Sequence, residues 1–215
     1  MAELFAPGRD CAKCPRLVDY RESSRAAQPS WHNAPVDSAG PIGARLLIAG
    51  LAPGMKGANR TGRPFTGDFA GDLLYPTLVK YGFAEGTYAR SADDGLTLSD
   101  CRITNAVRCV PPQNKPTGAE VLASRPFLLN EIGAMTNLRV ILGLGGIAHQ
   151  AVLRTLGCKV SAHKFGHRAK FALPNSLILI DSYHCSRLNT NTGRLTEAMF
   201  HEVFEDIGEV LNGAT

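Results

Sequence analysis

The sequence predicts an α/β fold with a central, mainly parallel four-stranded sheet flanked by helices. Two observations support this: apolar runs rich in β-branched residues, and helical patterns that alternate with them along the chain. The runs are nearly continuous in hydrophobicity, as is typical of strands that are covered on both faces. The predicted strands are Arg45–Leu51, Cys101–Val107, Arg139–Leu144 and Leu177–Tyr183.

Helical patterns follow each of these strands. The predicted helices are Asp72–Tyr81, Gly118–Met135, Gly146–Leu156 and Leu195–Leu211. In the last of them, apolar residues recur at steps of three and four and so mark one buried face. Residues 23–41 are predicted to be an irregular connection, and residues 53–71 a long glycine-rich loop directly after the first strand.

The length and composition indicate one globular domain, residues 1–215, with an ordinary share of hydrophobic (44%) and charged (20%) residues. The net charge of +4 is compatible with a polyanionic partner but does not require one. No apolar run approaches the length of a membrane span, and Met1–Arg16 lacks the apolar core of a signal peptide. We therefore expect a monomer in the cytoplasm, associated with the nucleoid, with no membrane partner.

Three segments that follow predicted strands hold most of the polar residues of interest. They are Gly50–Gly54 with its continuation to Asp68, Ile103–Pro112, and Asp181–Arg187 with its continuation to Thr196. In a parallel sheet the carboxyl ends of the strands meet at one edge, where ligands bind. The three segments are therefore predicted to converge on one site.

From Cys11 to Thr196, these ordered motifs resemble the uracil-DNA glycosylase superfamily and, within it, the thermophile-type family 5, also called type b. The resemblance implies a three-layer glycosylase fold and uracil-containing DNA as the partner. It also implies a monofunctional enzyme of base excision repair that flips the base out and hydrolyses its N-glycosidic bond. No lysine is placed to suggest a further lyase reaction.

Three residues are expected to recognise the base and stabilise its departure. His184 would donate a hydrogen bond to the developing uracil anion. Asn105 offers one acceptor and two donors for the edge of the base, and Phe65 would stack on its face. The plainer alternatives are a satisfied histidine at a strand end, an asparagine in a turn and a core phenylalanine.

Asp68 is expected to position the attacking water. Several members of the superfamily place Asp or Asn at the position of Ala52, whereas family 5 lacks a polar residue there. Asp72 is the rival, unless it only favours the start of a helix. Gly54 stands where the most uracil-specific members carry tyrosine, so hydroxymethyluracil, ethenocytosine and hypoxanthine are expected as further substrates. The predicted base-binding residues are Gly50, Leu51, Ala52, Pro53, Gly54, Phe65 and Asn105.

Basic and hydroxyl side chains in the same loops are expected to grip DNA phosphates, which position a protein without reading the sequence. Leu188 is expected to enter the vacated base stack as an apolar wedge. The alternative for each arginine is a solvated surface residue. The predicted phosphate contacts are Arg60, Arg63, Ser186, Arg187 and Arg194, together with Lys56.

The resemblance also implies a [4Fe–4S] cluster, held by Cys11, Cys14 and Cys109, with a structural role. Ser124 stands at the position of the fourth cysteine, so an alkoxide, an outside ligand, or a labile or absent cluster all remain open. Cys101 is about 26 Å from Cys109 along an extended strand and cannot share the site. The other two cysteines, Cys158 and Cys185, are expected to pack in the core.

Two other functions remain open. One is a non-catalytic or covalently trapping uracil-DNA binder on the same fold. The other is an unrelated iron–sulfur redox or nucleotide-binding α/β protein. Residues 143–146 resemble a phosphate loop but lack the G-x-G-x-x-G spacing, so a tight strand-to-helix turn is expected there.

Overall fold

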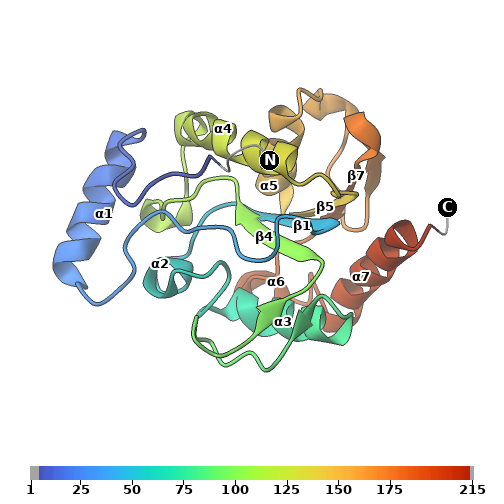
Figure 1. Ribbon diagram of the computed structural model, residues 1–215, viewed down its shortest axis with the longest axis horizontal. Coiled ribbons are helices and arrows are strands. Elements are labelled where there is room, and N and C mark those ends of the chain that lie inside the picture. Colours follow the sequence, from blue (N-terminus) through green and yellow to red (C-terminus); the bar gives the residue numbers. More distant parts are fainter. Residues whose placement is uncertain (1–4, 214–215) are drawn as a thin grey trace.

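The computed structural model describes residues 5–213 and has one five-stranded sheet at its centre (Figure 1). The strand order is β4-β1-β5-β7-β6; the first four strands are parallel, and β6 pairs with β7 antiparallel. The strands are β1 (Leu46–Gly50), β4 (Cys101–Asn105), β5 (Val140–Leu144), β6 (Lys170–Ala172) and β7 (Ile178–Ser182).

The predicted α/β class and its four strands are therefore confirmed, but the sheet has five strands rather than four. The strand that the sequence did not reveal, β6, is three residues long and lies at the edge of the sheet. Its residues are exposed or half-buried, so it lacks the apolar run that marks a central strand.

Helices cover both faces of the sheet and form three layers. Along β1, Leu46 and Ile48 point to the core under α3 and α7, whereas Leu47 and Ala49 point to the core under α4 and α5. The helices are α1 (Pro15–Ala27), α2 (Ala58–Thr61), α3 (Phe69–Lys80), α4 (Gly118–Ala134), α5 (Gly146–Thr155), α6 (Arg187–Asn191) and α7 (Glu197–Leu211). A small hairpin of β2 (Ala84–Glu85) and β3 (Thr97–Leu98) lies beside α3.

Three helices were not predicted. The first, α1, starts with a proline in its first turn and lies at the opposite end of the molecule from α7 (Figure 1). It buries Leu17, Arg21 and Ser24, so its inner face carries no regular apolar pattern. The other two, α2 and α6, have four and five residues. The stretches expected to be irregular thus contain the end of α1, the whole of α2 and the start of α3.

None of the helices within residues 5–213 is both long and apolar enough to cross a membrane. The two cores lie back to back on a single sheet, which agrees with one domain. The single domain over residues 1–215 stays a prediction, and its first four and last two residues lie outside the described part of the chain.

A buried ion pair joins α5 to the end of β7. His149 Nδ1 lies 2.9 and 2.8 Å from the two carboxylate oxygens of Asp181, and His149 Nε2 lies 2.9 Å from the carbonyl oxygen of His163. Both ring nitrogens face oxygen atoms, so the imidazole is placed to donate from both. Burial lowers the pKa of His149, but its bonds to Asp181 and the carbonyl outweigh this effect and raise it.

We expect Asp181→Ala to lower the free energy of unfolding by about 3–5 kcal/mol, because it removes the carboxylate partner of the buried His149 ring. Urea denaturation measures the change. Glu202→Ala is the matched control, because it breaks the exposed pair with Arg168 and should cost no more than about 1 kcal/mol. Equal losses in the two variants would contradict the role assigned to the buried pair.

Candidate active site

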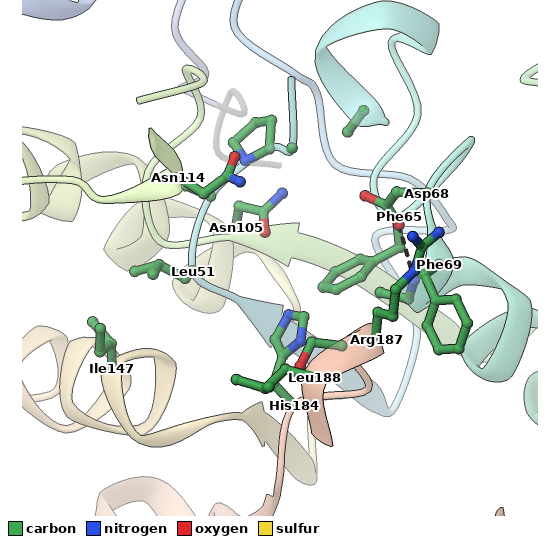
Figure 2. Close-up of a pocket in the computed structure, with 16 residues that line it drawn as sticks. Leu51, Phe65, Asp68, Phe69, Asn105, Asn114, Ile147, His184, Arg187 and Leu188 are labelled. Carbon is green, nitrogen blue, oxygen red and sulfur yellow. Dashed lines mark hydrogen bonds between the residues drawn. The ribbon is translucent and has the colours of Figure 1, made fainter. Parts of the chain in front are cut away.

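A cavity of about 660 Å³ opens at the carboxyl ends of the four parallel strands (Figure 2). The three segments predicted to converge all contribute to it. It is lined by Leu51, Ala52, Pro53, Gly54, Ala58, Phe65, Asp68, Phe69, Ala70, Asn105, Asn114, Ile147, His184, Ser186, Arg187 and Leu188. Asp68, Asn105 and His184 therefore share one cavity, as expected.

The floor of the cavity depends on Gly50, the last residue of β1. A Cβ at this position would lie 2.5 Å from both Asn105 Oδ1 and Phe65 Cζ. Gly50 itself does not line the cavity. It instead provides the space in which the Asn105 amide and the Phe65 ring lie together.

The Asn105 amide is buried, and its Oδ1 has no hydrogen-bond partner within the described residues. A buried acceptor without a partner costs about 1–3 kcal/mol, which a ligand that donates to it can recover. The position therefore fits a ligand with an N–H or O–H group. This is the strongest sign of binding in the cavity.

Phe65 is held in a left-handed backbone conformation with φ 52°. The Tyr88 hydroxyl donates to the carbonyl oxygen of Phe65, at 3.3 Å. A Cβ at Gly71 would lie 2.0 Å from that same oxygen, so the start of α3 packs tightly against it. Such strain persists only where the surrounding structure enforces it, and it often marks a functional site.

Asp68 caps the N-terminus of α3, where its carboxylate accepts a hydrogen bond of 3.1 Å from the Ala70 amide. Burial raises the pKa of Asp68, and the backbone amides of Ala70 and Gly71 only partly offset this. A Cβ at Gly57 would lie 2.3 Å from Asp68 Oδ2, and one at Gly54 would lie 3.1 Å from it. Both glycines thus leave the carboxylate room at the cavity.

Asp72, the rival candidate, does not line the cavity. Its two oxygens instead accept hydrogen bonds of 2.8 and 2.5 Å from Arg90 on the surface. Of the two carboxylates, only Asp68 can reach a molecule in the cavity.

His184 lies opposite Asn105, and its ring centroid is 6.0 Å from that of Phe65 (Figure 2). Burial lowers the pKa of His184, so the imidazole is neutral at pH 7 and keeps one N–H to donate. The Asn189 side chain donates to the carbonyl oxygen of His184, at 2.8 Å, and so fixes the loop to α6.

The predicted phosphate contacts divide into two groups. Ser186 and Arg187 line the cavity, and the Arg187 guanidinium lies over the Phe69 ring, 5.4 Å from its centroid. Arg60 and Arg194 lie outside the cavity lining; Arg194 lies over the Tyr183 ring.

The prediction for Arg63 needs correction. Its guanidinium makes a two-pronged ion pair with Asp94, with both hydrogen bonds at 2.8 Å, and lies over the Tyr75 ring. These contacts are mostly buried and use the donors that a phosphate would need. Arg63 therefore holds the loop that carries Phe65 in place instead of facing the cavity mouth.

Five lining residues were not predicted from the sequence: Ala58, Phe69, Ala70, Asn114 and Ile147. Asn114 follows Gln113, and both have left-handed backbones, with φ 56° and 55°. Ile147 is 54% exposed at the rim, and Leu188, the expected wedge, is 72% exposed there. The asparagine was detectable in principle, since Asn favours this conformation; an exposed isoleucine in a helix pattern gives no such signal.

A second, smaller cavity lies between the start of the chain, α1 and α4. The three predicted thiol ligands and Ser124 line it together. Burial raises the pKa of Cys109 to about 11, while the Arg21 guanidinium beside it favours the thiolate. Arg21 Nε is buried and makes no hydrogen bond within residues 5–213. We call this the thiol pocket, defined by Cys11, Cys14, Cys109 and Ser124.

The thiol pocket fits an iron–sulfur cluster better than a single metal ion. A single zinc ion needs thiolates at about 2.3 Å from one centre. No three cysteine, histidine or acidic side chains among the described residues form such a group. A [4Fe–4S] cluster keeps its protein sulfurs farther apart, because each binds a different iron. The cationic Arg21 beside the thiols also suits a cluster with anionic ligands.

Comparison with known proteins gives consistent results. A family model described as the uracil DNA glycosylase superfamily matches residues 38–208. A type-5 uracil-DNA glycosylase from Thermus thermophilus is 47% identical over 199 residues, which is 90% of each chain. One from Mycobacterium leprae is 43% identical over 213 residues, or 95% of this chain and 93% of its own. A type-4 uracil-DNA glycosylase from Pyrobaculum aerophilum is 33% identical over 159 residues, covering 74% and 66%.

We expect Gly50→Ala to lower the free energy of unfolding by about 1–3 kcal/mol, because the added methyl group overpacks the floor of the cavity. Thermal or urea denaturation measures the loss. Gly133→Ala on α4 is the control: nothing lies within 4 Å of its added Cβ, and it should stabilise the protein by about 0.4–1 kcal/mol. A Gly50→Ala variant as stable as the parent would contradict this, because it would show that Asn105 and Phe65 can move aside without loss of stability.

Proposed function

The chain belongs to the uracil-DNA glycosylase superfamily, and on this premise we propose that it hydrolyses the N-glycosidic bond of uracil in DNA as a type-5 enzyme of base excision repair. The observation that carries the proposal is the single cavity that holds Asn105, Asp68 and His184.

Base recognition rests on Asn105 and Phe65. The unpaired Oδ1 of Asn105 suits the N3–H of uracil, and its amide N–H suits O4. Cytosine presents the opposite pattern, a bare N3 and an amino group, and would leave these groups mismatched. Phe65 offers a fixed aromatic face for the flipped base, since both its backbone and its neighbours are constrained.

Cleavage moves the electrons of the glycosidic bond onto the uracil ring, where negative charge develops on O2. The neutral His184 imidazole can donate a hydrogen bond to this oxygen without first changing its protonation state. The burial that keeps His184 neutral also strengthens this interaction, because little water competes for the charge.

Asp68 is the proposed residue for positioning water at the sugar carbon. Its carboxylate lies in the cavity wall at the start of α3, with Gly54 and Gly57 leaving space beside it. The raised pKa of Asp68 makes it a somewhat better proton acceptor than an exposed carboxylate. It also means that the active, ionised form is lost at a higher pH than is usual for aspartate.

DNA would lie across the cavity mouth. Ser186 and Arg187 are placed to hold the phosphates next to the flipped nucleotide, and Arg60 and Arg194 would contact the flanking backbone. Leu188 and Ile147 project from two sides of the rim as exposed apolar side chains (Figure 2). We propose that they fill the gap that the flipped base leaves in the stack.

The family also implies a [4Fe–4S] cluster, and the thiol pocket supports one. Cys11, Cys14 and Cys109 would hold it, and when bound it would supply covalent links between the start of the chain and the segment after β4. The role that we propose for it is structural. The cytoplasmic, nucleoid-associated monomer likewise stays a prediction.

We expect Asp68→Asn and His184→Ala each to slow uracil release by about 10²–10³-fold, since each removes a group that acts in the transition state. A single-turnover assay with a uracil-containing oligonucleotide, followed by alkali, measures release. Parent activity should fall as the pH drops through the raised pKa of Asp68, and the residual activity of Asp68→Asn should lack that fall.

Asp72→Asn is the matched control, because its carboxylate pairs with Arg90 outside the cavity. It should release uracil at the parent rate. If Asp72→Asn released uracil slowly and Asp68→Asn released it at the parent rate, Asp72 and not Asp68 would be the residue that positions the water. A DNA adduct that survives denaturant, with no base released, would instead favour the covalently trapping alternative.

Ala52 and Gly54 line one side of the base site and have a small side chain or none. We therefore expect the protein to release bases larger than uracil as well. Release should be fastest for uracil, followed by hydroxymethyluracil, ethenocytosine and hypoxanthine, in duplexes of one sequence. Gly54→Tyr should suppress the larger bases more than uracil, because the side chain would occupy the cavity. A parent protein that releases uracil alone would refute this breadth.

A further inference from the structure

Ser124 lies in the middle of α4 and faces the thiol pocket. Its side chain shares the pocket lining with Cys11, Cys14 and Cys109, and the residue is only 7% exposed. A serine at a buried position of a helix normally needs a hydrogen-bond partner for its hydroxyl group.

Other buried helical hydroxyls in this protein find that partner in their own helix. Ser24, Thr77 and Thr155 each donate to the carbonyl oxygen four residues earlier, at 2.7 Å. The Ser124 hydroxyl makes no such bond, nor any other, to residues 5–213. The Ser124 hydroxyl therefore shares the pocket lining with three thiols and is free to bind a further atom there.

We infer that Ser124 Oγ is the fourth protein ligand of a [4Fe–4S] cluster, so that one iron is bound by oxygen and three by cysteine thiolates. The inference rests on the cluster proposed above. As the Fe–O bond forms, the hydroxyl proton passes to solvent and the alkoxide binds the iron, as each thiol does when it becomes a thiolate.

The charges around the thiol pocket suit this anionic ligand set. Arg21, Arg108 and Lys13 all line it. Arg108 donates to Glu131, a carboxylate that it shares with Arg102. Arg21 donates to the Cys11 carbonyl oxygen at 3.0 Å, and its Nε lies 3.7 Å from Glu22 Oε1. The buried Nε makes no hydrogen bond within residues 5–213, so it retains a donor for the cluster.

An oxygen ligand makes one iron chemically distinct. An alkoxide is a harder ligand than a thiolate and favours the more oxidised iron. It should lower the reduction potential of the cluster and make the iron that it holds the first to leave. One ferricyanide ion takes one electron from [4Fe–4S]²⁺, and the oxidised cluster then releases Fe²⁺ and becomes [3Fe–4S]⁺.

The test compares the full-length parent with Ser124→Cys and Ser124→Ala, all purified without oxygen. Iron and sulfide per chain, the visible spectrum, the reduction potential and iron loss to a ferrous chelator after ferricyanide are measured. Ser124→Cys should retain iron longest and have a higher potential than the parent. Ser124→Ala should lose iron faster than the parent by at least about tenfold, the smallest effect typical of altered metal surroundings.

Thr77→Ala is the control for loss of a buried helical hydroxyl, since Thr77 lies on α3 away from the thiol pocket, and it should match the parent. Circular dichroism checks that each variant folds. A Ser124→Ala protein with the iron loss and potential of the parent would overturn the inference. Iron-free parent protein that still releases uracil would overturn it too, yet leave the proposed function intact. Iron-bearing protein without uracil release would refute the function alone.

Discussion

The active site depends on the absence of a side chain at Gly50. At the end of β1, Gly50 leaves a space that the Asn105 amide and the Phe65 ring fill from two other segments of the chain. With any larger residue there, the pairing of β1 with β4 could not coexist with the present positions of both side chains. Gly57, in the loop between β1 and α2, likewise leaves room for the Asp68 carboxylate. Close packing against glycine backbone thus positions both the recognition groups and the water-positioning carboxylate, and the Ala70 amide adds a hydrogen bond to the latter.

Much of the fold could be predicted because the sheet is covered on both faces. A strand such as β1 must then be apolar throughout, and this leaves a pattern that is visible in one sequence. Elements that lack this requirement were missed. The edge strand β6 is partly exposed, and α1 uses Arg21 and Ser24 on its buried face, so neither shows the periodicity on which the prediction depends. Both are recognisable only from their tertiary contacts.

Some site residues could be predicted from the sequence and others could not, and the difference lies in what determines the position of each side chain. Asp68, Asn105 and His184 follow directly from their places after strands, because topology alone brings those places together. For charged residues, sequence proximity was misleading. Arg63 donates to the nearby Thr66 through Nε, but the other two nitrogens of its guanidinium bind Asp94, a partner that no local pattern reveals. The exposed Ile147 was missed because its position at a rim depends on how α5 meets the sheet.

The Arg63–Asp94 pair also bears on how sequence variation in this protein should be interpreted. Asp94 lies in the connection between β2 and β3, remote from the sheet edge along the chain, yet it anchors the turn that presents Phe65. In a deep mutational scan scored on repair, changes at Asp94 would therefore cluster with those of residues that touch DNA. A ranking of positions by such scores alone would place the β2–β3 hairpin in the substrate-binding surface. Asp94 in fact acts on the site through the Arg63 guanidinium.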